Sequence, residues 1–329
     1  MTQSGDEQQA HACLCETFAR VTERSALASA RWLGRSDQDA AEEAASDAMR
    51  AALERIPVDG QIVLGDGEGG PLDASERLGS GGMQVDLALD PLEGRGVVAR
   101  GGQGAMSMVA VGEPGSLMTL PEMYVRKLAV GPRARGKIDL LSPVGDNVRA
   151  VASAFGRNPG DITAIVLDRP RHHDLIEELR VAGARIKLIQ DGTVTAAISA
   201  AIRGTNDHLA IGIGGTRQAI LTAASMRCLG GEIQAQLWPT TRQEIETARE
   251  HGIEDVNRVF TTEDLARGHV FVVATGVTNG DLLRGVRFLA DSALTHSLVM
   301  CTRCNWVRFV DGLHFFSRDQ REEVRLPGF

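Results

Sequence analysis

Acidic side chains that suit a hard metal ion gather in the first third of the chain. Six carboxylates lie in or near the early elements: Glu42, Asp66, Glu68, Asp86, Asp90 and Glu93. Hard cations such as Mg²⁺ or Mn²⁺ prefer oxygen ligands and usually bind through a few carboxylates together with a substrate phosphate. If the fold brings these residues together, they predict metal-assisted chemistry on a phosphorylated substrate.

The most informative segment of this set is Asp90-Pro91-Leu92-Glu93-Gly94. It follows an alternating run, 85–90, that predicts a strand with Asp86 and Asp90 on the face opposite the apolar side chains. Pro91 is expected to fix a turn at the end of this strand and to direct both flanking carboxylates and the Leu92 carbonyl at one cavity. A solvated acidic turn is the alternative.

Two later segments suit an anion. Gly212-Ile213-Gly214-Gly215-Thr216-Arg217 predicts a glycine turn whose N–H groups precede a helix, although it matches no nucleotide-binding motif. Arg169 and Arg171 follow another strand and can hold a distal phosphate by forked hydrogen bonds. A structural turn and a plain basic loop are the alternatives. Tyr124, the single tyrosine, is either a core aromatic or a hydroxyl that contacts a sugar.

The five cysteines are Cys13, Cys15, Cys228, Cys301 and Cys304. Their odd number favours reduced thiols. Cys13-x-Cys15 and Cys301-x-x-Cys304 can be interpreted as four zinc thiolates. The preferred interpretation is that Cys301 packs at the end of an apolar strand and that the others are incidental.

The helices and strands expected to position these groups follow a different order in the two parts of the chain. Two amphipathic helices, about 14–34 and 38–56, precede strands at 61–64, 85–90 and 105–111. Helix–strand units then recur, with helices at 147–155, 173–182, 218–229 and 280–288 and strands at 162–167, 185–189, 208–211 and 270–274. The last strands, 297–301 and 305–309, are antiparallel candidates. This order predicts an α/β architecture with a metal-binding part, 1–144, and a substrate-binding part, 145–329, that share an interface.

Composition narrows the class of partner. The chain has 329 residues, a net charge of −8 and only 4% aromatic residues, which argues against a nucleic-acid partner. No run approaches the roughly 18 apolar residues that a membrane span requires. Because residues 1–7 carry neither a basic region nor an apolar run, we expect no signal peptide and a cytoplasmic location.

Taken in order, these segments resemble the class II fructose-1,6-bisphosphatases over about residues 17–316. The matching segments are 21–28, 32–35, 85–94, 121–124, 191–192, 212–215 and 274–283. The resemblance implies the layered α-β-α-β-α sugar-phosphatase fold with mixed sheets that inositol monophosphatases share. It also implies a homodimer or homotetramer, and hydrolysis of a sugar phosphate by a water activated by Mg²⁺ or Mn²⁺.

The resemblance also implies roles for individual residues. Metal ligands would be Glu42, Asp66, Asp90, Glu93 and Gln218, and substrate contacts would be Tyr124, Arg169, Arg171, Asp191 and Gly215. The catalytic group would comprise Asp90, Glu93, Asp66 and the position of Arg95, which also faces the substrate.

The chain departs from the family pattern at several of these positions. Glu42 and Asp66 exchange the usual aspartate and glutamate, Gln218 replaces a glutamate ligand, and Gln38 replaces a lysine. Arg95 replaces a threonine whose hydroxyl is thought to orient the attacking water. A guanidinium can hold phosphate but cannot generate hydroxide as a metal ion does, so we expect one metal position to be weakened or replaced.

These observations favour a phosphatase of gluconeogenic carbohydrate metabolism. Its substrate would be fructose 1,6-bisphosphate, sedoheptulose 1,7-bisphosphate or a specialised sugar or cyclitol phosphate. The alternative is a catalytically impaired homologue that binds phosphosugars or regulates a partner. A different reaction on a phosphorylated sugar is a third hypothesis.

Overall fold

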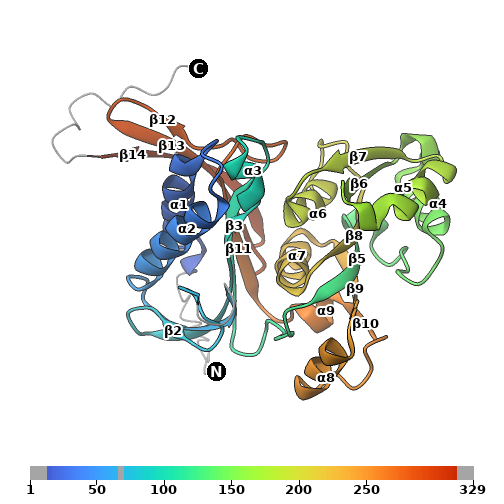
Figure 1. The fold of residues 1–329 in the computed structure, drawn as a ribbon, viewed down its shortest axis with the longest axis horizontal. Helices are drawn as coiled ribbons and strands as arrows, with labels where there is room; N and C mark the ends of the chain where they lie inside the picture. The colour runs from blue at the N-terminus through green and yellow to red at the C-terminus, as the bar shows by residue number, and fades with distance from the viewer. Residues whose placement is uncertain (1–12, 66–69, 317–329) are drawn as a thin grey trace, which may run out of the picture.

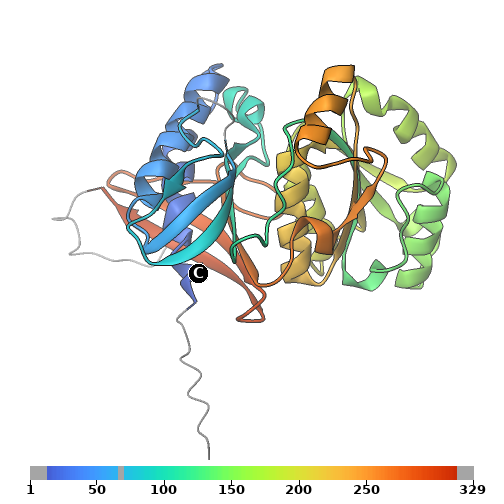
Figure 2. The same cartoon turned by 90° about the horizontal axis from the view of Figure 1, so that it is seen from below.

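The computed structural model describes residues 13–65 and 70–316, in which two mixed sheets alternate with three layers of helices (Figure 1). This arrangement confirms the expected α-β-α-β-α class. Seen at right angles, both sheets flank the same central helices (Figure 2). None of the helices in the described part of the chain is long and apolar enough to cross a membrane.

The first sheet has the order β12-β13-β11-β4-β3-β1-β2, and β14 pairs with β13. Only β1 and β3 run parallel. The strands are β1 (Val58–Leu64), β2 (Arg77–Leu78), β3 (Met83–Glu93), β4 (Met106–Gly112), β11 (Val270–Gly276), β12 (Arg287–Phe288), β13 (Ser292–Cys301) and β14 (Trp306–Phe315).

The second sheet has the order β10-β9-β5-β8-β6-β7, with β6 parallel to both of its neighbours. Its strands are β5 (Tyr124–Val130), β6 (Thr163–Leu167), β7 (Arg185–Ile189), β8 (Leu209–Gly215), β9 (Glu232–Leu237) and β10 (Val259–Thr261). The sequence division near residue 144 stays a prediction, but it does not separate the sheets. β5 precedes it yet lies in the second sheet, whereas β11–β14 follow it yet complete the first.

Helices cover both outer faces and fill the centre (Figure 1). α1 (Ala19–Ser29) and α2 (Gln38–Leu53) cover the first sheet, and α4 (Val144–Phe155) and α5 (His173–Val181) cover the second. The central layer holds α6 (Thr193–Ala201), α7 (Thr216–Leu229) and the short α9 (Thr262–Leu265). α3 (Arg95–Ala99) follows β3, and α8 (Arg242–Glu250) lies near β10.

Alternation along β3 explains how the first sheet can be buried on both faces. Leu87 and Leu89 pack under α1 and α2, while Ala88 joins the central core with α7. Asp86 and Asp90 share the face of Ala88, as the alternating pattern predicts. The central core is rich in small side chains such as Ala223 and Ala224 of α7, which let the helix layer approach both sheets closely.

Two expected elements are wrong. The predicted helix 280–288 is a loop followed by β12, because Gly285 is pressed against the Thr278–Asn279 backbone and its N–H donates to Asn279 Oδ1 at 2.9 Å. The predicted turn at 212–215 is the end of β8, because its backbone pairs with β5, a strand that the sequence analysis missed. The elements α6, β9 and α8 were also missed.

Candidate active site

The candidate site is built around a bulge at the end of β3. Asp90 pairs with Met108 of β4 and Glu93 pairs with Met106, so that β3 carries an extra residue between these pairs. The bulge takes the place of the expected turn at Pro91, whose carbonyl accepts a hydrogen bond from Ser25 Oγ at 2.9 Å. Both carboxylates are only 3% exposed. The structure therefore fixes two buried acidic groups at one end of the sheet.

Glu93 is held by the beginning of α6. Its Oε1 accepts a hydrogen bond from the Val194 N–H at 2.8 Å, and its Oε2 accepts one from Thr195 Oγ1 at 3.3 Å. The helix starts directly after Gly192, which has the left-handed φ of 85°. Because a helix N-terminus carries partial positive charge, it stabilises the carboxylate that faces it.

Asp90 contacts the beginning of α7. Gln218 Nε2 donates a hydrogen bond to Asp90 Oδ2 at 3.3 Å. Burial raises the pKa of Asp90 to about 6, although the nearby Arg217 guanidinium lowers it. Burial also raises the pKa of Glu93 to about 8, and the charge of Asp90 adds to this effect. Positive charge from this chain's own side chains therefore compensates the two carboxylates only in part.

Lys127 is a charged residue that the sequence analysis missed. It lies in β5, is 7% exposed, and its Nζ donates to Thr193 Oγ1 at 2.9 Å. Burial lowers its pKa to about 8, while the charges of Glu93 and Asp90 act in the opposite direction. Its signal in the sequence is a lysine directly before the apolar run Leu128-Ala129-Val130.

Arg95 and Glu42 form an ion pair at the mouth of the site. The Arg95 guanidinium also lies 3.6 Å from Asp39 Oδ1. Arg95 opens α3 directly after Gly94, whose φ of 97° turns the chain out of β3. Glu42 projects from α2, so the pair links two elements across the entrance. One expected metal ligand thus already has a cation as its partner.

A cavity of about 230 Å³ joins most of the residues singled out in the sequence. Seven of them line it: Glu42, Asp90, Glu93, Arg95, Asp191, Gly215 and Gln218. Arg217 and Glu122 also line it and were missed as site residues. Asp66, like Glu68, lies outside the described residues. Asp86 does not line the cavity, and its Oδ2 accepts a long hydrogen bond from the Leu117 N–H at 3.4 Å.

The other three predicted substrate residues do not line this cavity but are tied to its wall. The Arg171 guanidinium lies 5.1 Å from the centre of the Tyr124 ring, and Tyr124 pairs with Gly215 across the second sheet. Arg169 donates a hydrogen bond to the Gln190 carbonyl at 2.6 Å, directly before Asp191. Tyr124 is 45% exposed and is therefore not a core aromatic.

The donor set fits a hard divalent cation at Asp90 and Glu93. Both offer carboxylate oxygens, and the raised pKa of each shows that additional positive charge would stabilise their ionised forms. Glu42 and Gln218 fit less well, because one is paired with Arg95 and the other presents an amide N–H to Asp90.

Comparison with known proteins identifies the family. The model of the bacterial, glpX-encoded fructose-1,6-bisphosphatase family matches residues 12–314. The chain belongs to the class II fructose-1,6-bisphosphatase family. It is 38% identical to the D-fructose 1,6-bisphosphatase class 2/sedoheptulose 1,7-bisphosphatase of Synechococcus sp. strain JA-3-3Ab, over 93% of this chain and 96% of that protein. A protein of the same name from Microcystis aeruginosa strain NIES-843 is 36% identical, over 93% and 97% of the two chains.

A third relative, from Acaryochloris marina strain MBIC 11017, is named as the second such enzyme of its organism and is 38% identical over 92% of this chain and 96% of that protein. Membership of the class II fructose-1,6-bisphosphatase family implies dependence on a divalent metal. The fit of Asp90 and Glu93 to a hard cation agrees with that dependence. The cavity is lined by residues between Glu42 and Gln218, which come from both sheets and from the helices beside them.

Proposed function

We propose that this chain hydrolyses a phosphate ester of a sugar bisphosphate with Mg²⁺ or Mn²⁺. The substrates that we favour are fructose 1,6-bisphosphate and sedoheptulose 1,7-bisphosphate, with a place in gluconeogenic carbohydrate metabolism. The observation that carries the proposal is the pair of buried carboxylates, Asp90 and Glu93, at a cavity that two arginines also line, within a class II fructose-1,6-bisphosphatase fold.

The chain's own side chains would hold the metal ion and orient the phosphate and the sugar of the substrate. A divalent ion, when bound, supplies charge to the phosphoryl oxygens and lowers the pKa of a water molecule. Asp90 and Glu93 would hold that ion, and the beginning of α6 keeps Glu93 in place. Arg95 and Arg217 line the same cavity and would bind phosphate oxygens. Asp191 and Gly215 would contact the sugar, with Tyr124, Arg169 and Arg171 receiving its distal part. The role expected of Asp66 stays a prediction.

The second candidate function is a phosphosugar-binding or regulatory protein with impaired catalysis. The observation that favours it is the ion pair between Arg95 and Glu42, because a guanidinium occupies a position where the family resemblance implies water orientation and metal binding. Such a protein would keep the anion-binding cavity while losing water activation.

Release of inorganic phosphate from a panel of sugar phosphates, with Mg²⁺ or Mn²⁺, distinguishes the two. The phosphatase hypothesis predicts release from at least one bisphosphate and little from the corresponding monophosphates. Thermal stabilisation by a bisphosphate without any release would contradict it and support the binding hypothesis.

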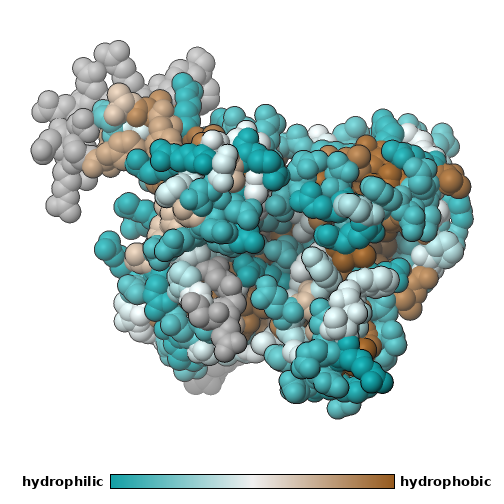
Figure 3. Space-filling view, viewed as in Figure 1, coloured by the Kyte–Doolittle hydropathy of each residue, from teal (hydrophilic) through white to brown (hydrophobic). Residues whose placement is uncertain are grey.

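We also propose a homodimer or homotetramer in the cytoplasm. The ribbon of β12, β13 and β14 supports assembly, because it projects from the first sheet and gathers apolar side chains at its surface (Figure 3). Phe288, Phe309 and Phe316 are 40%, 48% and 49% exposed there. Light scattering coupled to size-exclusion chromatography tests the assembly, and a monomer at micromolar concentration would contradict it.

A further inference from the structure

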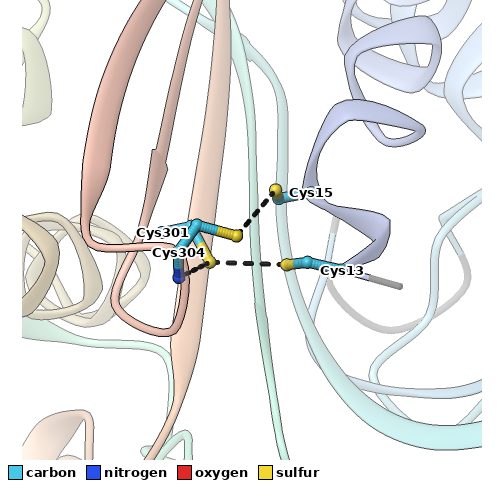
Figure 4. A group of neighbouring side chains, drawn as sticks. All are labelled: Cys13, Cys15, Cys301 and Cys304. Carbon is cyan, nitrogen blue, oxygen red and sulfur yellow. Dashed lines mark hydrogen bonds between the residues drawn. The ribbon is translucent and has the colours of Figure 1, made fainter. Parts of the chain in front are cut away.

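Four of the five cysteines converge beside the first sheet although they come from opposite ends of the chain. Cys13 directly precedes the short 3₁₀ helix Leu14–Glu16, and Cys15 lies within it. Cys301 ends β13, and Cys304 lies in the turn that leads to β14 (Figure 4). All four sulfur atoms lie within 4.8 Å of one another.

The distances between these sulfurs suit a shared metal ion. Cys13 Sγ lies 3.4 Å from Cys301 Sγ, and Cys15 Sγ lies 3.9 Å from Cys304 Sγ. A disulfide would bring two sulfurs to about 2.05 Å. Four thiolates around Zn²⁺, each about 2.3 Å from the ion, lie roughly 3.8 Å apart in a tetrahedron. The observed separations lie near the tetrahedral value.

The turn between Cys301 and Cys304 is held in a shape that supports thiolate ligands. The Cys304 N–H donates a hydrogen bond to Cys301 Sγ at 3.4 Å, an interaction that stabilises negative charge on sulfur. Thr302 Oγ1 accepts a hydrogen bond from the Val270 N–H at 3.0 Å, which fastens the turn to β11. Asn305 has the left-handed φ of 52°, which returns the chain to β14.

Ordinary core packing does not account for this arrangement. A cysteine packed against a core often acts as a small apolar side chain, and the half-buried Cys228 is an example, with its Sγ 3.6 Å from the carbonyls of Val270 and Met300. Packing does not require four sulfurs to meet at one point. Here they do so across sequence separations of 288 and 289 residues. Cys15 and Cys301 are also only 1% and 3% exposed, so solvent does not compete for them.

We propose that Cys13, Cys15, Cys301 and Cys304 form a structural zinc site. Four protein ligands complete the tetrahedral coordination of Zn²⁺ and leave no open position for a substrate or water, so the site is structural rather than catalytic. Zinc displaces the thiol protons on binding and fastens the segment before α1 to the β13–β14 hairpin. This proposal takes up the four-thiolate alternative of the sequence analysis, and it is compatible with the expected packing of Cys301 at the end of β13.

The zinc site is remote from the candidate active site. Cys301 pairs with Phe271 near the start of β11, whereas Gly276 at its other end pairs with Met106, the partner of Glu93. The two pairs are five residue steps apart along β11, which corresponds to about 17 Å. The proposal therefore does not depend on the proposed phosphatase activity.

Zinc content of the full chain tests the proposal. The chain is produced with zinc in the medium, purified without chelators and analysed by inductively coupled plasma mass spectrometry. We expect about one zinc per chain in the native protein and in Cys228→Ser, the matched cysteine control. Asp90→Asn should also retain its zinc, because it alters only the candidate active site. Cys304→Ser should lose most of the zinc and unfold at a lower temperature.

A measurement on the native chain covers the case in which Cys304→Ser fails to fold. Production with Co²⁺ in place of zinc should give the intense sulfur-to-cobalt charge-transfer absorption of a tetrathiolate site. Native protein with neither zinc nor this absorption would overturn the proposal. So would iron in place of zinc, full zinc content in folded Cys304→Ser, or an unreduced mass that is four hydrogens lower, which would indicate two disulfides.

Discussion

At the scale of single residues, this chain places its own positive and polar groups where the family resemblance implies metal ligands and their charge. Arg95 pairs with Glu42, and Gln218 donates a hydrogen bond to Asp90. Both contacts stabilise a carboxylate that a second metal ion would otherwise stabilise. Neither of them provides a Lewis acid that could activate a water molecule. We therefore expect fewer bound metal ions than in a relative with threonine and glutamate at positions 95 and 218.

Substitution of Arg95 tests this expectation. Arg95→Thr frees Glu42 and supplies a hydroxyl, so we expect an additional Mn²⁺ per chain in the presence of inorganic phosphate and a turnover at least about tenfold higher. Equilibrium dialysis and phosphate release measure the two effects. Arg95→Lys keeps the cation and should show neither. Arg100→Thr removes a positive charge from the other end of α3 and serves as the second control. An unchanged ion count in Arg95→Thr would contradict the expectation.

The raised pKa of Glu93 predicts how stability depends on pH when divalent metal is omitted. Its folded-state pKa of about 8 lies above the ordinary value of 4.5 because the ionised form is buried. The folded state therefore binds the proton more tightly than the unfolded state does. As pH rises from about 4.5 to about 8, Glu93 progressively lowers the free energy of unfolding. Glu93→Gln has no such proton and keeps the acceptor for the Val194 N–H.

We expect the stability advantage of Glu93→Gln over the native chain to grow between about pH 5 and pH 8 by a few kcal/mol. Urea unfolding of both proteins at several pH values, without divalent metal, measures the difference. Saturating Mn²⁺ should reverse the trend by stabilising the native chain most at the high end. A difference that is independent of pH would contradict the assigned pKa.

At the scale of elements, the sequence predicted those segments whose pattern is local. The start of α2 at residue 38, the alternation along β3 and the antiparallel pairing of the last two strands were all predicted correctly, because helical periodicity and period-2 alternation depend on neighbouring residues. The bulge at Pro91 and the strand character of 212–215 could not be read in this way. Both depend on pairing with another strand, β4 or β5, and the local sequence does not show which strands pair or in which register.

The N-terminus of α6 is the clearest example of a missed element with a functional consequence. Its sequence, Thr193 to Ala201, contains two threonines and a valine near its start, and β-branched residues weaken a local helix signal. Tertiary contacts decide the outcome, because its first turn donates hydrogen bonds to Glu93. Lys127, which donates to Thr193, escaped notice for the same reason.

A pair of glycines tests the importance of this helix start. Gly192 and Gly183 both have left-handed φ values, 85° and 81°, but only Gly192 precedes α6. Alanine at either position should lower stability by about 1–2 kcal/mol through backbone strain. Only Gly192→Ala should also lower turnover, by roughly tenfold or more, because it displaces the donors to Glu93. Thermal unfolding and phosphate release compare the two. Equal turnover in both variants would contradict the role given to α6.

At the scale of the whole molecule, the chain keeps the family fold, and the candidate site lies between its two sheets. Residues from α2, β3, α3, β8 and α7 meet at one cavity only because the chain crosses between the two sheets. The order of the motifs in the sequence was sufficient to identify the family and its fold. They could not show that Glu42 and Gln218 have partners within the protein, since that depends on side chains brought together across two sheets.

The function proposed for the cavity around Asp90 is metal-dependent hydrolysis of a phosphate ester. The most direct measurement is phosphate release from fructose 1,6-bisphosphate as a function of Mn²⁺ concentration, in the native chain and in Asp90→Asn. We predict release that saturates with Mn²⁺ in the native chain and is lost in Asp90→Asn, while the variant unfolds at an equal or higher temperature without metal, because a costly buried charge has been removed. Metal-independent release, or equal release by folded Asp90→Asn, would contradict the claim.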